Sequence, residues 1–244
     1  MRNIKLTLAY DGAAYAGFQR QAGLATIQAA LEGCLENLTR ERTRVIAAGR
    51  TDAGVHALGQ AVNFRTLARM PTASFVPALN SLLPRDIAVL ATVEVPADFH
   101  ARFWAKSKTY TYRLWRLPVR PVFERGRVYH FSRPLDLSAI TDATRLLTGK
   151  HDFACFCSAG SSVKTSVRTV FQAGWVEQGE ILAFTVTADG FLYKMVRNMA
   201  GTLLQVGLGK RPPAWVEELL AGKDRKAAGP SVPAGGLWLV RVEY

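Results

Sequence analysis

Hydrophobic and polar positions in the first 100 residues follow the period of a strand and then that of a helix. The run IKLTLAY at 4–10 alternates like a half-buried strand. From Ile27 to Leu38 apolar residues recur at every third or fourth position, and Thr26 stands where a helix N-cap belongs. The same reasoning predicts strands over 43–49, 60–65 and 86–95, and a helix over 75–83 that is closed by a proline. The order βαββαβ is that of a ferredoxin-like unit.

The second half repeats this order with insertions, although no repeat is visible in the residues themselves. We predict a strand over 108–117, a helix over 137–147 that stops at Gly149, a hairpin of strands 168–178 and 181–190 across Gly179, a helix over 191–207, a short helix over 215–220 and a strand over 236–244. We therefore expect an α+β protein with an N-terminal half, residues 1–100, a C-terminal half, residues 101–244, and a cleft between them.

The composition is that of a globular protein. Of the 244 residues, 49% are hydrophobic, which is enough to bury one large core or two smaller ones. No apolar run approaches the roughly 18 residues of a membrane span, and the first residues lack the layout of a signal peptide, so we expect a cytoplasmic protein. Three cysteines and four scattered histidines suit neither a disulfide framework nor a metal site, and no metal is expected.

Positive charge is concentrated in one segment of a chain whose net charge is +12. Residues 102–133 hold nine basic residues and a single acidic one, so they carry +8, and eight Phe, Trp and Tyr residues are interleaved with them. Cations meet phosphates and rings stack on bases, so this pattern favours nucleic-acid binding. A strand pair with a buried aromatic face and a solvated basic face is the alternative. A membrane surface is less favoured because no basic amphipathic helix accompanies the segment.

The strongest candidate for chemistry is a lone acid, Asp52, in the stretch AAGRTDAGVHALGQAVNF at 47–64. Gly49 and Gly54 let the backbone approach a ligand, and Arg50 is close enough to keep the carboxylate ionised. An ordinary turn aspartate is the alternative. Asp11 lies in a comparable glycine-rich turn, which we expect its own side chain to cap. A single carboxylate can act as a nucleophile or assist proton transfer, whereas paired-carboxylate hydrolysis needs a second acid.

These residues resemble the TruA family of tRNA pseudouridine synthases. The stretch GRTDAGVHA is highly specific for that family. The other blocks of the family follow in order along essentially the whole chain: AYDGAAYAGFQRQ, LNSLLPRDIAV, FHARFWAKSKTYTYRL, GKHDFACF, FLYKMVRNMAGTLLQVGLGK and GLWLVRVEY. Trp104 and Trp238 stand where other side chains are common in the family, and neither departure touches the chemistry.

The resemblance implies a fold and an activity. The fold is two ferredoxin-like halves joined into one mostly antiparallel sheet with a central cleft that binds RNA. The activity is isomerisation of uridine to pseudouridine at positions 38, 39 and 40 of the tRNA anticodon arm. This reaction breaks the N1–C1′ bond and forms a C5–C1′ bond. The family uses no cofactor or metal, and its members act as homodimers.

The resemblance also assigns roles to single residues. Asp52 corresponds to the catalytic aspartate, acting as nucleophile or as the base that starts a glycal route. Tyr110 corresponds to the tyrosine that stacks on the target base, although the residues alone leave Tyr112 equally open, because both lie on one face of a strand. Arg197, otherwise a residue beside an apolar helix stripe, corresponds to the arginine that pairs with the aspartate.

Arg50 and His56 belong to the signature stretch, and we place Arg50 with the substrate-binding residues. His56 could equally be a packed core histidine, and Lys194 is given no role. From their positive charge alone, we expect four arginines to bind RNA: Arg20, Arg116, Arg120 and Arg125.

Two other functions remain open from the residues. A catalytically silent RNA-binding protein on the same scaffold fits the basic stretch, but it gives no reason for Asp52 and the chain lacks the K-G-F-G-F-V type of run. A nucleoside hydrolase would need further acids or a metal.

Overall fold

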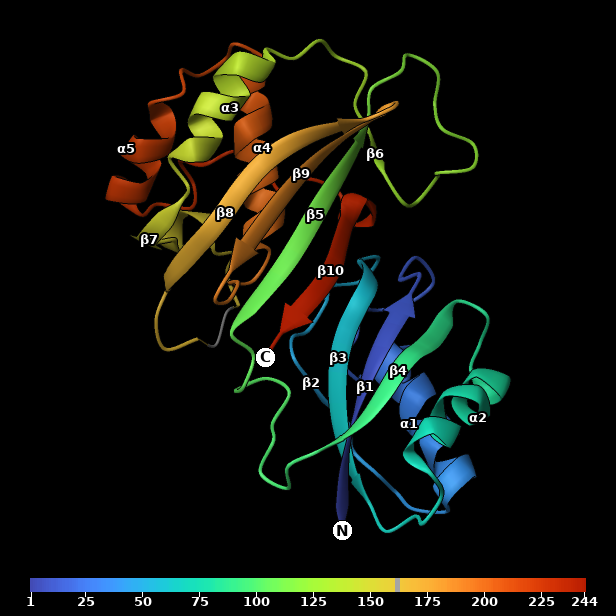
Figure 1. Ribbon diagram of the computed structural model, residues 1–244. Helices are drawn as coiled ribbons and strands as arrows, with labels where there is room; N and C mark the ends of the chain where they lie inside the picture. Colours follow the sequence, from blue (N-terminus) through green and yellow to red (C-terminus); the bar gives the residue numbers. More distant parts are fainter. Residues whose placement is uncertain (161–162) are drawn as a thin grey trace. The chain divides into compact units, whose positions relative to one another are not determined.

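The computed structural model describes residues 1–160 and 163–244, and the chain forms two compact units (Figure 1). Unit 1 consists of Met1–Lys106 and Trp238–Tyr244, and unit 2 of Ser107–Leu237. Among the described residues, no helix is both long and apolar enough to span a membrane.

Unit 1 has the predicted order βαββαβ. Its elements are β1 (Arg2–Tyr10), α1 (Ile27–Thr39), β2 (Ile46–Ala47), β3 (His56–Thr66), the 3-10 turn η1 (Thr72–Ser74), α2 (Phe75–Leu82) and β4 (Ile87–Val95), followed by β10 (Leu237–Glu243). The strands run β4-β1-β3-β10, with β2 also paired to β3. All these pairs are antiparallel except β3 with β10.

The core of unit 1 follows from the hydrophobic pattern. The alternation in β1 puts Ile4, Leu6 and Leu8 in the core with no exposed surface. Thr26 caps α1, since its side chain accepts a hydrogen bond from the Ala29 backbone N–H at 3.3 Å. Helices α1 and α2 pack against each other. Strand β3 is buried along almost its whole length because it is a central strand.

Unit 2 is a second α+β unit. Its elements are β5 (Ser107–Trp115), β6 (Tyr129–His130), α3 (Leu137–Arg145), β7 (Gly149–Asp152), the 3-10 turn η2 (Ala154–Phe156), β8 (Val167–Gln178), β9 (Ile181–Ala188), α4 (Met195–Gly207), α5 (Trp215–Gly222) and the 3-10 turn η3 (Ala234–Gly236). Strands β5, β9, β8 and β7 follow one another with antiparallel pairing, and the short β6 pairs with β5 in parallel. Both units are therefore α+β with mostly antiparallel strands, as predicted.

Several boundaries differ from the predicted ones, for local reasons. The strand expected over 43–49 is reduced to Ile46–Ala47. Helix α4 begins at Met195 and not at 191, because Lys194 takes a left-handed conformation with φ 59°. Gly149, expected to stop a helix, begins β7 instead. The hairpin across Gly179, whose φ is 57°, is confirmed. By its contacts, the last strand belongs mainly to unit 1.

Candidate active site

Asp52 lies on a short turn of unit 1 between β2 and β3. The Val55 N–H donates to the Asp52 carbonyl at 3.1 Å and closes the turn. Gly54 has a φ of 77°, which only glycine adopts without strain. Asp52 is half-buried, so the residue is partly accessible to a substrate.

A glycine-rich loop, residues 11–26, packs directly onto this turn. The Phe18 N–H donates to the Thr51 carbonyl at 3.0 Å. A Cβ at Gly17 would lie 2.7 Å from the same carbonyl oxygen, and a Cβ at Gly12 would overlap the Val55 carbonyl oxygen. Side chains at these two positions would therefore displace the turn that carries Asp52.

Buried polar groups hold the other side of the turn. The hydroxyls of Tyr10 and Thr51 lie 2.8 Å apart, and the Gln60 side-chain amide donates to the Gly49 carbonyl at 2.8 Å. Burial raises the pKa of Tyr10 to about 12, so the phenol stays protonated and can donate. Residues 49–51 are thus fixed to the core strands β1 and β3, as positioning of a reactive group requires.

His56 is a core residue beneath the same turn. Its side chain has no exposed surface, and its Nδ1 accepts from the Gly12 N–H at 3.1 Å and lies 3.0 Å from Asp11 Oδ1. The ring stacks on Trp238 with centroids 4.4 Å apart. Asp11 Oδ1 also accepts from the Ala13 N–H at 3.0 Å, so this aspartate caps its own turn as expected. His56 and Asp11 together join the glycine-rich loop to β3.

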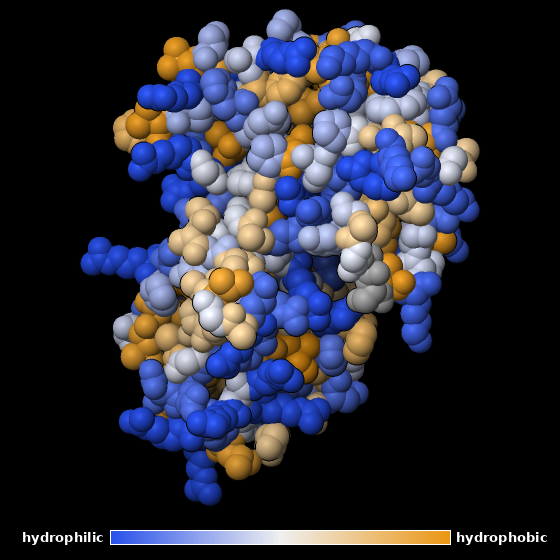
Figure 2. All heavy atoms as spheres, turned by 180° about the vertical axis from the view of Figure 1, so that it is seen from behind, coloured by the Kyte–Doolittle hydropathy of each residue, from blue (hydrophilic) through white to orange (hydrophobic). Residues whose placement is uncertain are grey.

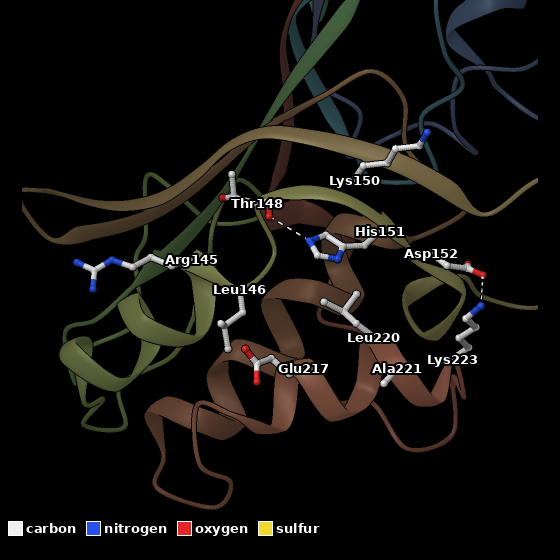
Figure 3. A pocket seen from close by; sticks show the side chains of 10 residues that line it. All are labelled: Arg145, Leu146, Thr148, Lys150, His151, Asp152, Glu217, Leu220, Ala221 and Lys223. Atoms are coloured by element: carbon white, nitrogen blue, oxygen red, sulfur yellow. Dashed lines mark hydrogen bonds and ion pairs between the residues drawn. The ribbon is translucent and has the colours of Figure 1, made fainter.

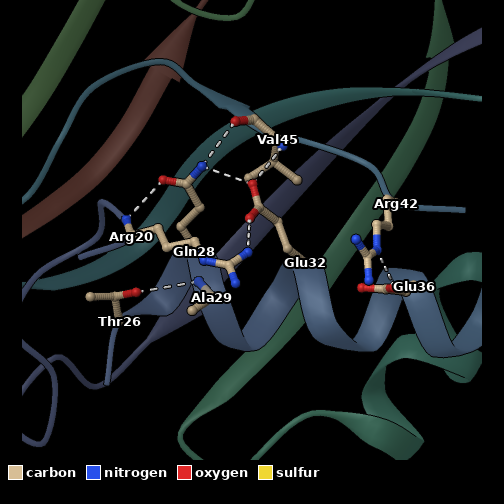
Figure 4. Close-up of polar contacts among 8 residues, drawn as sticks. All are labelled: Arg20, Thr26, Gln28, Ala29, Glu32, Glu36, Arg42 and Val45. Atoms are coloured by element: carbon tan, nitrogen blue, oxygen red, sulfur yellow. Dashed lines mark hydrogen bonds and ion pairs between the residues drawn. The ribbon is translucent and has the colours of Figure 1, made fainter. Parts of the chain in front are cut away.

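Arg20, near the middle of the glycine-rich loop, is tied to helix α1 (Figure 4). The Glu32 carboxylate is nearly buried and accepts from Arg20 at 3.2 Å, from the Gln28 amide at 2.8 Å and from the Val45 N–H at 3.0 Å. The Arg20 side chain is still 67% exposed. It therefore anchors the loop and leaves part of its guanidinium in solvent, while Arg50 is exposed beside Asp52.

In unit 2, strand β5 carries the two candidate tyrosines in different environments. The Tyr112 side chain has no exposed surface, and its hydroxyl donates to the Pro233 carbonyl at 2.9 Å. Burial raises the pKa of Tyr112, which keeps this donor protonated. Tyr110 is 7% exposed and packs edge-on against Phe191 with centroids 4.9 Å apart. The Tyr112 hydroxyl thus has a structural partner inside the unit.

Arg197 lies in the first turn of α4 and binds the same segment. Its Nε donates to the Val232 carbonyl at 2.8 Å, next to the carbonyl that Tyr112 binds. Its positive charge acts on the Tyr112 phenol and partly opposes the rise in the pKa that burial causes. The fold of unit 2 therefore fixes the guanidinium of Arg197 through residues 232–233.

Comparison with known proteins decides the family. A family model described as tRNA pseudouridine synthase matches residues 7–104 and 143–244. The chain belongs to the tRNA pseudouridine synthase family. It is 45% identical over 244 residues to tRNA pseudouridine synthase A of Caldicellulosiruptor bescii, covering all of both chains. It is 49% identical over 243 residues to tRNA pseudouridine synthase A of Moorella thermoacetica, covering 99% of each. It is 46% identical to that of Geobacillus kaustophilus, covering all of this chain and 95% of the relative.

Family membership confirms the resemblance inferred from the sequence and gives the site residues their context. The structure brings Arg50, Asp52 and the anchored Arg20 into unit 1, and Tyr110 and Arg197 into unit 2. The reasoning from sequence missed the supports of the Asp52 turn, Gly12, Gly17, Tyr10, Thr51 and Gln60. The glycine spacing in AYDGAAYAG is the one signal of these supports that the sequence offers.

The basic segment, residues 102–133, shows features of both structures that its sequence pattern allows: exposed cations and rings for nucleic acid, and a buried aromatic face. Tyr110 and Tyr112 are buried, whereas Phe103 is 75% and Phe123 92% exposed. Arg120 and Arg125 are exposed, as is Arg116, which binds Glu177 at 2.7 Å. Hydrophilic residues also cover most of the face drawn in Figure 2. The segment therefore offers exposed cations and rings together with a buried aromatic face.

A groove on the surface of unit 2 is lined by none of these residues. It has a volume of about 650 Å³ and lies between α3, α5 and β7 (Figure 3). Lys223 pairs with Asp152 at 3.0 Å, and His151 Nε2 donates to the Thr148 carbonyl at 3.0 Å. Hydrogen bonds from Ser166 and Lys223 lower the pKa of Asp152. The charges that line this groove are largely matched within the unit.

Proposed function

We propose that this chain converts uridine to pseudouridine at positions 38, 39 and 40 of the tRNA anticodon arm, with Asp52 as the catalytic carboxylate. Membership of the tRNA pseudouridine synthase family supports the reaction and the substrate class. The choice of positions in the anticodon arm rests on the resemblance of the sequence blocks. The observation that best supports the catalytic role of Asp52 is that its turn is fixed in place. Gly12 and Gly17 lie against its backbone, and Tyr10 and Gln60 hydrogen-bond to Thr51 and Gly49.

The chemistry needs only one well-placed carboxylate. The N1–C1′ bond breaks, the uracil rotates and a C5–C1′ bond forms, while N1 gains a proton and C5 loses one. Nothing is oxidised, reduced or hydrolysed, so no cofactor or metal enters the balance. Asp52 either attacks the ribose as a nucleophile or removes a ribose proton to start a glycal route. Exclusion of water protects the intermediate from capture.

Residues from both units complete this proposal. Tyr110 stacks on the target base, and its hydroxyl takes part in proton transfer. The choice of Tyr110 over Tyr112 rests on the resemblance of the sequence blocks. Arg197 holds the Asp52 carboxylate ionised, a role that rests on the resemblance of the sequence blocks. Arg50, exposed next to Asp52, contacts the substrate.

The proposed partners are tRNA and a second copy of this chain. The tRNA backbone is bound by the exposed cations that charge alone selects, which are Arg20, Arg116, Arg120 and Arg125. The expected homodimer rests on the resemblance alone, and the cytoplasm is the expected compartment because the first residues lack the layout of a signal peptide.

One experiment tests the proposed function. Purified protein is incubated with tRNA that carries tritium at C5 of its uridines, and release of tritium is followed while the modified positions are mapped. The proposal predicts release with pseudouridine at 38, 39 or 40. Tight tRNA binding without release would favour the catalytically silent RNA-binding protein. Release with pseudouridine elsewhere would contradict the proposed positions.

A further inference from the structure

A second groove of unit 2 is lined by positive charge. It has a volume of about 420 Å³ and lies where α4 has ended and α5 begins. Lys210, Arg211 and Lys226 line it, and all three are exposed. These residues lie outside the basic segment 102–133, and no role follows for them from the site already described.

The three cations are not neutralised within the chain. Across residues 1–160 and 163–244, no carboxylate forms an ion pair with Lys210, Arg211 or Lys226. Three other exposed cations do form ion pairs: Arg42 with Glu36, Arg145 with Asp142 and Lys223 with Asp152. An unpaired cluster of like charges is repulsive by itself, and an anion relieves that repulsion.

The groove is built on fixed structure. Its wall at 227–230 packs onto α4 so closely that a Cβ at Gly229 would lie 2.6 Å from Thr202 Cα. Arg225 clamps this wall, donating to the Gly229 carbonyl at 3.0 Å and to Asn198 Oδ1 at 2.9 Å. The Arg211 guanidinium lies 5.2 Å from the centroid of the buried Trp215 ring. The three cations therefore line a groove that also includes Trp215 and a wall that is hydrogen-bonded to α4.

We propose that this groove binds the phosphodiester backbone of the tRNA away from the target base. The proposal rests on the proposed function. Helix α4 joins Arg197 to the groove, and at about 1.5 Å per residue its stretch from Arg197 to Gly207 spans about 15 Å. The phosphates held by Lys210 and its neighbours thus belong to nucleotides beyond the reacting uridine. The groove is open and has no enclosed cradle, which suits a continuous chain of phosphates better than a single small anion.

A purely structural role makes a different prediction. Just past the end of α4, Gly209 has a φ of 69°, and the Lys210 N–H donates to the Gln205 carbonyl at 3.1 Å. Cations near a helix C-terminus offset the negative end of its dipole. Lys210 and Arg211 in that role would affect stability and leave RNA affinity unchanged.

The test compares two triple variants that lose the same charge. The first is Lys210→Gln, Arg211→Gln and Lys226→Gln. The control is Arg42→Gln, Arg145→Gln and Lys223→Gln, which removes cations that are already paired. Affinity for a full-length tRNA transcript is measured from 50 to 200 mM salt, with the free energy of unfolding in urea and tritium release at saturating tRNA.

The groove variant is expected to bind more weakly and to lose about 2–2.7 from the slope of log K against log salt, at 0.7–0.9 per phosphate contact. The ratio of the wild-type affinity for tRNA to that of the groove variant then falls by about 20- to 40-fold between 50 and 200 mM salt. The control keeps the wild-type slope. Tritium release at saturating tRNA stays near wild type for the control, because none of its three residues is assigned to the chemistry or to tRNA binding.

Each other outcome has a defined meaning. A wild-type slope with a reduced free energy of unfolding would overturn the proposal in favour of the dipole role. A wild-type slope with unchanged stability would also overturn it and direct the search to a partner other than RNA. If the triple variant does not fold, Lys226→Gln, which lies outside α4, is expected to lower the slope by about 0.7–0.9. Wild-type protein that binds in this way but releases no tritium would refute the proposed function and leave the groove standing.

Discussion

Replacement of Gly17 by alanine tests whether the glycine-rich loop positions Asp52. Gly17 has a φ of 96°, and its Cβ would lie 2.7 Å from the Thr51 carbonyl oxygen and 3.2 Å from Ala53 N. Backbone atoms on both sides leave no flexible side chain to yield. The loop must therefore retreat from the turn, or the turn that carries Asp52 must move.

The structure allows the size of the effect to be estimated and matched with a control. Left-handed backbone costs an L-residue about 1–2 kcal/mol, and forced overpacking adds about 1–3 kcal/mol. Gly17→Ala should therefore lower the free energy of unfolding by about 2–5 kcal/mol. Gly23 lies in the same loop with a φ of 73°, but its Cβ would meet nothing within 4 Å. Gly23→Ala should show only the backbone part.

The difference between these two variants isolates the close approach to the Asp52 turn. Urea unfolding gives the stabilities, and tritium release from C5-labelled tRNA gives turnover at saturating substrate. If displacement of the Asp52 turn removes about 1.4–2.7 kcal/mol of stabilisation from the transition state of the reaction, turnover of Gly17→Ala falls about 10- to 100-fold. Gly23→Ala should turn over like wild type. Equal stability and equal turnover of the two variants would refute the positioning role of the loop.

Three further predictions follow from the site and the surface. Tyr110→Phe should lower turnover much more than tRNA affinity, because the ring still stacks with about 1–3 kcal/mol per base. Tyr112→Phe should instead lower the free energy of unfolding by about 0.5–1.5 kcal/mol, since it removes the hydrogen bond to the Pro233 carbonyl; an inactive Tyr112→Phe beside a normal Tyr110→Phe would reverse the assignment. The triple variant Arg116→Gln, Arg120→Gln and Arg125→Gln should lower the slope of log K against log salt for tRNA binding by about 0.7–0.9 for each phosphate that is no longer neutralised. An unchanged slope would place the RNA path elsewhere. Burial raises the pKa of Cys155 to about 12 and also raises that of Cys34, so alkylation at pH 8 should label only the half-exposed Cys157. Buried thiols that stay protonated stabilise the folded state below the ordinary thiol pKa of 9.0, and this stabilisation is lost as the pH rises above that value. Mass spectrometry that shows a labelled Cys155 in the native protein would contradict the expected alkylation pattern.

Local signals were sufficient for most of the fold. The alternation in β1, the capped apolar stripe of α1 and the glycine between β8 and β9 each act within a few residues, and each element formed where predicted. The short strands β6 and β7 depend on pairing with distant partners, so no local pattern marks them. The start of α4 was misplaced because the left-handed conformation of Lys194 has no signature in its residue type.

The site shows the same division. A lone aspartate between glycines pointed to Asp52, since the residue types themselves imply a fixed turn near a ligand. The roles of Gly12 and Gly17 could not be derived, because they depend on which backbone atoms face them across the fold. The choice between Tyr110 and Tyr112 likewise could not be made from the residues alone, because both lie on one face of a strand and only the resemblance to the family separates them.

The central claim is that the Asp52 carboxylate carries the chemistry, and Asp52→Asn tests it most directly. The amide has nearly the same shape but no charge, so the turn and the tRNA affinity should be preserved. We expect single-turnover tritium release from C5-labelled tRNA to fall to background while tRNA affinity stays within about twofold of wild type, that is, within about 0.4 kcal/mol. Clear residual turnover by the purified variant would remove Asp52 from its proposed role.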